Sequence, residues 1–292
     1  MEKDNSENMR VIQWYPGHMA KAKRLIKENL QAVDLVVELL DARLPLSSRN
    51  PMLAQIINHK PRVLVLNKAD LADAARLKQW IAYFNRQGLK AVPINSLDGK
   101  GIKQLVTAVR EVLRAKMEKI VMKRGKARPM RLMILGIPNV GKSSLINKLA
   151  KQNSAKVGNK PGVTKGKQWI KIAHDMELLD TPGVLWPKFE DQEVGRKLAV
   201  TGAINDDVYP LDEVVMWLLD YLLKENPAIL QERFKLAELP SLPYELFQQI
   251  GRRRGCLRSG GELDEMKVFQ VILQEFRKGL LGRLILDRPE GE

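Results

Sequence analysis

A short segment rich in glycine, with a lysine and two serines, carries the clearest chemistry of the sequence. Gly136, Gly141, Lys142 and Ser143 have the spacing G-x4-G-K-S, which is typical of a loop that binds nucleotide phosphates. Glycines there let backbone N–H groups close around phosphate oxygens. Lys142 would supply a positive charge to the β and γ phosphates, and the Ser143 hydroxyl would bind Mg²⁺. The other residues that we expect at the phosphates are Asn139, Val140 and Ser144.

A second segment has the residue types that recognise a guanine base. Asn67, Lys68 and Asp70 directly follow the apolar run 63–66. A carboxylate at Asp70 can accept hydrogen bonds from N1–H and the exocyclic amine of guanine, whereas adenine presents an acceptor at N1 and would leave the carboxylate unpaired. Asn67 can bridge loop and base, and the stem of Lys68 can cover the face of the base. The remaining residues expected at the base are Asn95 and Ser96, after the short run 91–94.

A third segment could complete a magnesium site. Asp180 follows the predicted strand 177–179, so its carboxylate can hold Mg²⁺ through water, and the N–H of Gly183 can meet the γ phosphate. Thr164 lies in sequence between the phosphate loop and Asp180. We expect its hydroxyl to close on Mg²⁺ when a γ phosphate is present, although a single threonine in such a loop is more often merely solvated. The expected metal ligands are therefore Ser143, Thr164 and Asp180.

The elements that must position these residues alternate between apolar runs and helical patterns. Runs at 35–40, 63–66, 91–94, 131–135, 169–172 and 177–179 predict a mostly parallel six-stranded sheet with flanking helices, an α/β fold. Because the phosphate motif lies between a strand and a helix, a phosphate loop is favoured over a plain glycine-rich turn. Beyond Pro187 the patterns are helical, near 190–200, 211–225, 243–253 and 264–278. We expect an N-terminal segment at 1–32, an α/β domain at 33–206 and a smaller all-α domain at 207–292.

The charge balance indicates a polyanionic partner. The 292 residues include 49 Lys and Arg against 34 Asp and Glu, a formal net charge of +15, which favours nucleic acid first and an anionic membrane second. One cysteine, Cys256, excludes a disulfide framework and a thiolate zinc site, and three scattered histidines disfavour a histidine metal site. No apolar run approaches the roughly 18 residues of a membrane span, and the acidic start is unlike a targeting signal. We expect a cytoplasmic protein.

Together these segments resemble the five sequence boxes of the translation-factor class of GTPases, in an unusual order. In most such proteins the phosphate loop comes first, whereas here residues 67–70 and 95–96 precede it. The order is that of a circular permutation, which a domain tolerates when its ends lie close together at the surface. The segments that carry a closer resemblance are 14–19 (WYPGHM), 41–43 (DAR), 67–70 and 136–144. They are similar to those of the ribosome biogenesis GTPase A family of bacteria, over nearly the whole chain.

The resemblance implies a GTPase that acts on the large ribosomal subunit. It implies that GTP favours docking on a late precursor of that subunit and its rRNA, that the particle stimulates hydrolysis to GDP, and that hydrolysis favours release. Val184 and Leu185, after Gly183, cannot orient water by hydrogen bonding, so another group must do so. The resemblance assigns this role to His18. It also implies that Asn139 coordinates K⁺, although a residue at this position can simply suit the loop.

Three basic clusters suit contact with rRNA phosphates. They lie at 114–131, at 148–171, and around a run of arginines near the C-terminus. The residues that we expect to bind RNA are Lys165, Lys167, Arg252, Arg253, Arg254 and Arg258. Two other functions stay open: a GTP-dependent RNA-binding scaffold whose hydrolysis is incidental, and a basic signalling GTPase at an anionic membrane. The sequence shows no basic amphipathic helix or lipidation motif, which disfavours the second. We expect a monomer away from the ribosome.

Overall fold

A computed structural model describes residues 17–57, 59–151, 169–179 and 191–289, although not the side chains of 17–23. These residues divide into two compact units. The sheet unit comprises 17–179 and 285–289, and the helical unit comprises 191–284. The division therefore falls near residue 188, before the boundary expected at 206/207, because the helix that follows residue 191 packs with later helices.

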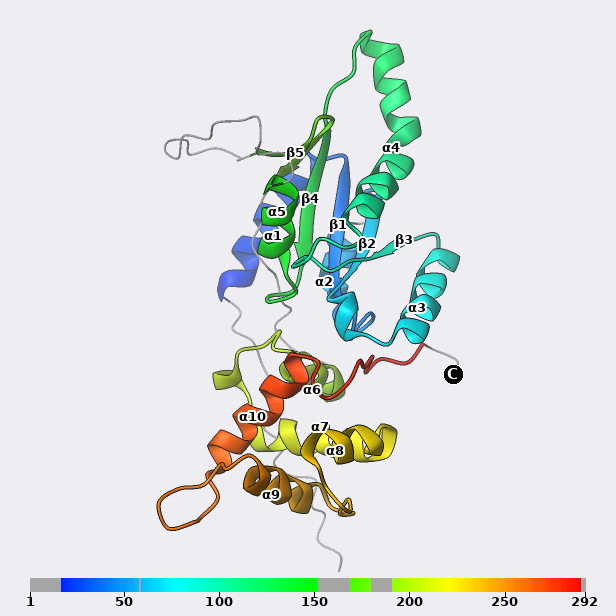
Figure 1. Cartoon of the computed structure of the whole chain (residues 1–292). Helices are drawn as coiled ribbons and strands as arrows, with labels where there is room; N and C mark the ends of the chain where they lie inside the picture. Colours follow the sequence, from blue (N-terminus) through cyan, green and yellow to red (C-terminus); the bar gives the residue numbers. More distant parts are fainter. Residues whose placement is uncertain (1–16, 58, 152–168, 180–190, 290–292) are drawn as a thin grey trace, which may run out of the picture. The chain divides into compact units, whose positions relative to one another are not determined.

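The sheet unit is built on a six-stranded sheet with the order β3-β2-β1-β4-β6-β5. All neighbours are parallel except β5 and β6, which are antiparallel. The central strands are mostly apolar and mostly buried on both faces, as is typical of parallel sheets. The mostly parallel six-stranded sheet predicted from the sequence is confirmed (Figure 1). The strands are β1 (Leu35–Asp41), β2 (Arg62–Asn67), β3 (Lys90–Pro93), β4 (Met130–Gly136), β5 (Trp169–Ala173) and β6 (Met176–Leu179).

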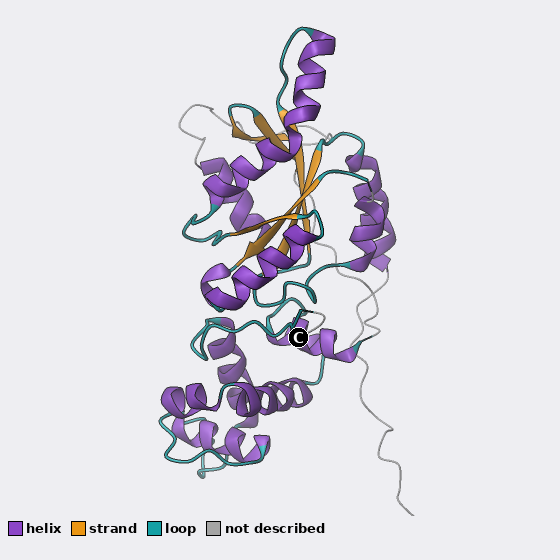
Figure 2. Ribbon diagram, turned by 90° about the vertical axis from the view of Figure 1, so that its right-hand side faces the viewer, coloured by secondary structure: helices purple, strands orange, loops and turns teal. Residues whose placement is uncertain are grey.

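Helices cover both faces of this sheet (Figure 2). On one face, α1 (Gly17–Leu30) and α2 (Pro51–Ile57) pack over β1, β4 and β6, and α3 (Ala74–Arg86) packs over β1 and β2. On the other face lie α4 (Ile102–Arg124) and α5 (Lys142–Lys151), with Leu105 and Leu149 beside Ile134 of β4. This three-layer arrangement leaves the carboxyl ends of the parallel strands free to form a site.

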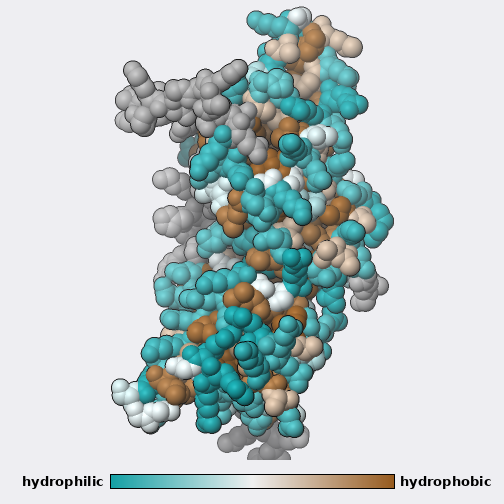
Figure 3. All heavy atoms as spheres, in the orientation of Figure 1, coloured by the Kyte–Doolittle hydropathy of each residue, from teal (hydrophilic) through white to brown (hydrophobic). Residues whose placement is uncertain are grey.

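Helix α4 is longer than the sequence pattern predicted. We expected a helix over about 101–118 followed by a linker, but the helix continues to Arg124 and ends at Gly125, whose φ is +68°. The added residues are mostly lysine, methionine and valine, so a run of positive charge was mistaken for a linker although lysine is a good helix former. The last turns project beyond the sheet (Figure 1), and hydrophobic and hydrophilic side chains lie side by side at that end of the molecule (Figure 3). Val121 and Met122 in these turns are exposed.

Residues 285–289 return to the sheet unit after the chain has formed the helical unit. Ile285 is 1% exposed and packs in the cluster under α3 that contains Trp80 and Phe84. The sequence places these residues in the expected all-α domain at 207–292, because an extended segment has no periodicity that reveals where it docks. The segment is thus a piece of the sheet unit's core that lies far away in sequence.

The returning segment also holds the loop that follows β1. The backbone N–H of Leu286 donates to the carbonyl oxygen of Arg43 at 2.9 Å. The buried carboxylate of Asp287 accepts hydrogen bonds from the backbone of Leu46 at 2.8 Å and of Ser47 at 2.7 Å, and from the Ser47 hydroxyl at 2.5 Å. Charge-assisted bonds of this kind are among the stronger ones, so the loop and the segment order each other.

The helical unit is centred on α7 (Leu211–Glu225), which contacts the unit's other four α-helices. Four of its helices lie close to the expected ranges. The fifth, Pro227–Phe234, was not predicted because Pro227 suggested a break, yet proline is well tolerated at the first helical position. The other helices are α6 (Gln192–Val200), α8 (Pro227–Phe234), α9 (Pro243–Arg253) and α10 (Glu265–Arg277). None of the described helices is long and apolar enough to span a bilayer.

Candidate functional site

The predicted phosphate loop lies between β4 and α5, in the middle of the sheet. Strand β4 ends at Gly136 and helix α5 begins at Lys142, so the motif joins a strand to a helix N-terminus as expected. Asn139 and Gly141 have φ angles of +54° and +103°, which turn the backbone sharply. The ammonium of Lys142 donates to the carbonyl oxygens of Gly136 at 3.2 Å and Ile137 at 2.7 Å. The lysine charge is therefore held at the loop.

Asn67 ties this loop to the predicted guanine segment. Its Nδ2 donates to the carbonyl oxygen of Val140 at 2.7 Å, and its Oδ1 accepts from the backbone N–H of Ser96 at 3.0 Å. The side chain is 1% exposed, so both hydrogen bonds form away from water. One amide thus joins three loops that follow β2, β3 and β4.

The close approach of these loops depends on Gly141. A Cβ atom there would lie 2.3 Å from Nδ2 of Asn67 and 3.3 Å from Oγ of Ser96. Real Cβ atoms do not come so close to a fixed neighbour, and the positive φ already disfavours a side chain. The glycine spacing of the phosphate motif is therefore required here by packing against the guanine segment.

The residues expected to contact the base lie at the same edge of the sheet. Asp70 is exposed in a short 3-10 helix, Ala69–Leu71, so its carboxylate is accessible to a ligand. The backbone N–H of Ala69 donates to the carbonyl oxygen of Ile94 at 3.0 Å, which joins this turn to the end of β3. Asn95 accepts from the backbone N–H of Leu97 at 2.9 Å and orders the second base-binding loop. The structure thus brings together the expected phosphate and base residues from 67–70, 95–96 and 136–144.

Other predicted residues lie outside the described part of the chain. These are Thr164, Lys165, Lys167, Asp180 and Gly183, while His18 lies in α1 with its side chain not described. Of the three predicted magnesium ligands, Ser143 is therefore the one with a described position. It is exposed in the first turn of α5, next to Lys142, where its hydroxyl could reach a phosphate-bound cation.

Comparison with known proteins decides the family. A family model described as "50S ribosome-binding GTPase" matches residues 131–241. A Bacillus cereus protein named "Ribosome biogenesis GTPase A" is 54% identical over 280 residues, which cover 96% of this chain and 95% of that protein. The chain belongs to the ribosome biogenesis GTPase A family. A mouse protein named "Mitochondrial ribosome-associated GTPase 1" is 34% identical over 298 residues, which cover 95% of this chain and 90% of that protein.

Structural comparison agrees with membership of the ribosome biogenesis GTPase A family. A crystal structure titled as GNP-bound YlqF from T. maritima has a TM-score of 0.63 and 27% sequence identity, and the match covers 92% of this chain and 99% of that one. The 50S ribosome-binding GTPase model begins at Arg131, next to the start of β4, after the guanine segment has already passed in sequence. This start agrees with the circular permutation inferred from the order of the motifs.

The four arginines predicted to bind RNA lie in the helical unit, and their contacts differ. Arg252, Arg253, Arg254 and Arg258 are all exposed. The Nη2 atom of Arg254 also lies 2.7 Å from a carboxylate oxygen of Glu275, and its guanidinium lies 5.1 Å from the centre of the Phe234 ring. The charge of Arg254 therefore contributes to the packing of the helical unit as well.

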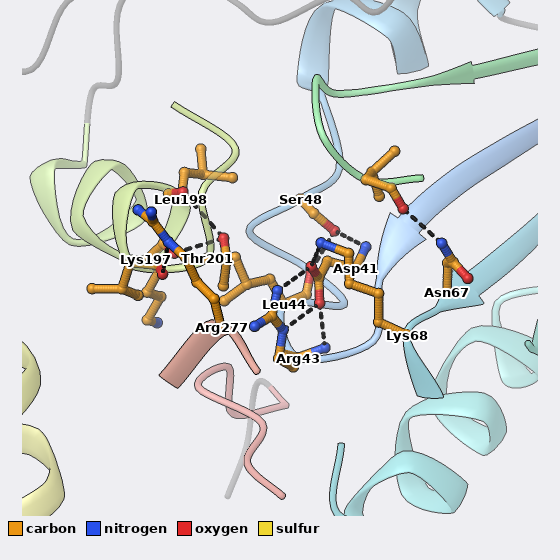
Figure 4. Close-up of polar contacts among 12 residues, drawn as sticks. Asp41, Arg43, Leu44, Ser48, Asn67, Lys68, Lys197, Leu198, Thr201 and Arg277 are labelled. Carbon is orange, nitrogen blue, oxygen red and sulfur yellow. Dashed lines mark hydrogen bonds and ion pairs between the residues drawn. The ribbon is translucent and has the colours of Figure 1, made fainter. Parts of the chain in front are cut away.

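The site of this family member also contains residues to which sequence reasoning gave no role. Asp41 and Arg43 were noticed as part of a motif, but the sequence did not reveal what they contact. Lys68 lies 2.9 Å from Asp41, which in turn binds Arg43 (Figure 4). One feature of the sequence pointed to this contact. Asp41 ends a mostly apolar run, as Asn67 and Gly136 do, and residues at the ends of parallel strands lie at the same edge of a sheet.

Proposed function

We propose that this protein binds a late precursor of the large ribosomal subunit in its GTP-bound state, hydrolyses GTP when the particle stimulates it, and is then released. Membership of the family makes the chain a GTPase of ribosome assembly. The observation that best supports the finer proposal is the double hydrogen bond of Asn67 to Val140 and Ser96. Loops joined in this way can bind the base and the phosphates of one nucleotide and respond together to its state.

The proposed nucleotide contacts follow the chemistry of the loops. Asp70 would accept from the guanine base, and Lys142 with the backbone of residues 139–144 would bind the phosphates. A relative of known structure, YlqF from T. maritima, is described as GNP-bound, which supports a nucleotide as ligand of this site. The residues proposed to hold Mg²⁺, which would neutralise charge on the β and γ phosphates, are Ser143, Thr164 and Asp180.

Catalysis would need a group that orients water, because Val184 and Leu185 cannot. We assign this role to His18, which would polarise the attacking water rather than remove its proton. Asn139 is exposed in the phosphate loop and would help to bind K⁺, whose charge can act between the β and γ phosphates. The two roles can be tested separately. The role of His18 is tested by replacing its side chain, and the role of K⁺ is tested by changing the cation in the buffer.

The RNA contact is proposed for exposed basic residues of both parts of the chain. Arg252, Arg253, Arg254 and Arg258 would bind rRNA phosphates from the helical unit. Lys165 and Lys167 would bind them from the segment that follows the phosphate loop in sequence. The net charge of +15 supports binding that weakens steeply with salt. We place the protein in the cytoplasm, where bacterial ribosomes assemble, as a monomer when it is away from the particle.

The test is GTP turnover measured alone, with mature large subunits and with precursor particles, in K⁺ and in Na⁺. We expect strong stimulation by particles that is lost in His18→Ala, and a further dependence on K⁺. Turnover that stays flat in every condition would contradict stimulation and favour an RNA-binding scaffold with incidental hydrolysis. Cosedimentation with anionic vesicles at physiological salt would instead favour a membrane-surface GTPase.

A further inference from the structure

The carboxylate at the end of β1 lies beside the guanine segment. In the parallel register of β1 and β2, Asp41 is the partner of Asn67, and the backbone N–H of Ala42 donates to the carbonyl oxygen of Asn67 at 2.7 Å. Asp41 is 3% exposed. A buried carboxylate at this place requires partners, because an isolated buried charge is costly.

Arg43 fixes the orientation of this carboxylate. Its Nε lies 2.9 Å from Oδ1 and its Nη2 2.7 Å from Oδ2 of Asp41, a two-pronged ion pair between side chains that are both almost fully buried. The backbone N–H of Arg43 also donates to Oδ1, at 3.0 Å, and the backbone N–H of Asp41 donates to Oγ of Ser48, at 3.1 Å. Such paired planar groups are geometrically specific, so Asp41 has little freedom to move.

The second cation on this carboxylate is Lys68. Its Nζ lies 2.9 Å from Oδ2 of Asp41, although its side chain is 25% exposed and could reach water. Lys68 has φ +59° and ψ +35°, a left-handed conformation that is uncommon for a residue with a side chain. Burial alone would raise the pKa of Asp41, but Arg43 and Lys68 together bring it well below its usual range. The carboxylate is therefore charged and pairs with the ammonium of Lys68 (Figure 4).

We propose that Asp41, held by Arg43, is a positioning residue that fixes Lys68 so that its aliphatic stem is ready to cover the guanine base. The inference rests on the proposed nucleotide site at residues 67–70. A lysine side chain that is free in solution loses rotamer entropy when it packs on a ligand, and an ion pair formed beforehand reduces that cost. Arg43 already provides Asp41 with three hydrogen bonds, so anchoring of the loop alone does not need the lysine.

A double-mutant cycle in the full-length protein tests this relationship. GDP affinity is measured by calorimetry for the wild type, Asp41→Asn, Lys68→Met and the double variant, since GDP binding avoids turnover. We expect Asp41→Asn to weaken GDP binding about tenfold in the wild-type background and less than about twofold in the Lys68→Met background. Lys68→Met keeps an apolar stem but removes the charge on which Asp41 acts.

Asp34→Asn is the matched control. Asp34 directly precedes β1, whereas Asp41 ends it, and Asp34 also binds an arginine and a lysine: Arg128 at 2.7 Å and Lys116 at 2.7 Å. We expect its substitution to lower thermal stability and to leave GDP affinity within about twofold. A loss of affinity in Asp34→Asn equal to that in Asp41→Asn would assign the effect to general destabilisation and overturn the proposal.

Other outcomes of the cycle would contradict the proposal. If Asp41→Asn weakens GDP binding equally in both backgrounds, Asp41 acts on the loop and not through Lys68. If Asp41→Asn does not fold, the ammonium signal of Lys68 in ¹⁵N NMR of the wild-type GDP complex, identified by its loss in Lys68→Met, supplies the answer. Slow hydrogen exchange of that signal supports the ion pair, and fast exchange overturns it. A wild-type protein that binds no GDP would instead contradict the proposed nucleotide site itself.

Discussion

The side-chain amide of Asn67 donates to the carbonyl oxygen of Val140 at 2.7 Å, across 73 residues of sequence. Through this bond, the segment with the residue types for a guanine base is held against the segment with those for phosphates. The permuted order of the motifs has no effect on this geometry, because each motif follows its own parallel strand. What matters is that β2 and β4 are parallel strands of one sheet with β1 between them, so that their carboxyl ends lie at the same edge.

Gly141→Ala should abolish tight nucleotide binding without unfolding the protein. The new Cβ would meet Nδ2 of Asn67 at 2.3 Å, so the loop or the amide must shift and the bridge to Val140 would break. We expect GTP affinity to fall more than about tenfold, as for the loss of a buried hydrogen-bond network. Calorimetric titration measures the affinity, and circular dichroism checks the fold.

Gly88→Ala is the matched control for this substitution. Gly88 also has a positive φ, +73°, but a Cβ there meets nothing within 4 Å. Both variants therefore bear the strain of a left-handed alanine, about 1 kcal/mol, and only one of them clashes. Equal loss of GTP affinity in the two variants would show that backbone strain is responsible and not contact with Asn67.

Asp34→Asn should reduce the dependence of stability on acid pH. Burial alone would raise the pKa of Asp34, but hydrogen bonds from Arg128 and Lys116 bring the pKa well below its usual range. A carboxyl with a lowered pKa stabilises the fold at pH values above its unfolded pKa, near 4, and this stabilisation is lost as the pH falls further. We expect the variant to lose about 1–3 kcal/mol at pH 7 and much less at pH 2.

Urea unfolding between pH 2 and pH 7 measures this difference. Part of the acid sensitivity should persist in the variant, because the pKa of Asp41 is lowered in the same direction. Glu118→Gln, at an exposed carboxyl of α4, serves as the control and should leave the profile unchanged. A wild-type profile that runs parallel to that of Asp34→Asn would contradict the prediction.

Ile285→Ala should destabilise the sheet unit although the residue follows the helical unit in sequence. Ile285 is buried beside Trp80 and Phe84, so truncation opens a cavity under α3 and should cost about 2–5 kcal/mol. Trp80 fluorescence during urea unfolding follows the change best when the other tryptophans are replaced by phenylalanine. Leu280→Ala, at a side chain that is 43% exposed, should change the unfolding free energy by less than about 0.5 kcal/mol.

The arginines of the helical unit should separate into two functional groups. Replacing Arg252 and Arg253 together by alanine should weaken binding to rRNA fragments and leave thermal stability unchanged. The slope of log affinity against log salt concentration should fall by about two, because two phosphate contacts are lost. Arg254→Ala should instead lower the melting temperature, because Glu275 loses a partner at 2.7 Å and retains Arg233 at 2.8 Å. Filter binding at several salt concentrations, beside thermal unfolding, distinguishes the two. Loss of stability in the double variant would contradict this assignment.

Local patterns predicted the strands and the loops of the site. Asn67 and Gly136 each end an apolar run, and their neighbours have chemistry that depends on residue type and short spacing, which a sequence displays directly. The predicted end of α4 was wrong because the run of positive charge outweighed the helix propensity of the same residues. Gly125 marks the true end of the helix. The contacts of Arg254 with Glu275 and Phe234 could not be predicted, because a sequence shows a charge but not its partner.

The position of Ile285 could not be predicted for a different reason. An extended segment has no hydrophobic periodicity, and it packs into a cavity that forms only after the other elements have packed. The same holds for the contact between Asp41 and Lys68, which needs the register of β1 against β2 before two charges 27 residues apart can meet. Contacts between distant residues were therefore the part of the site that the structure added.

The return of residues 285–289 to the sheet unit sets the order in which the chain can mature during synthesis. During synthesis the N-terminus leaves the ribosome first, so the strands and helices up to α5 emerge long before Ile285 does. The pocket under α3 stays open until the whole helical unit has been translated, and Asp287 cannot yet hold the loop after β1. Nascent chains that stall within the helical unit would carry an incomplete sheet unit and be recognisable as unfinished.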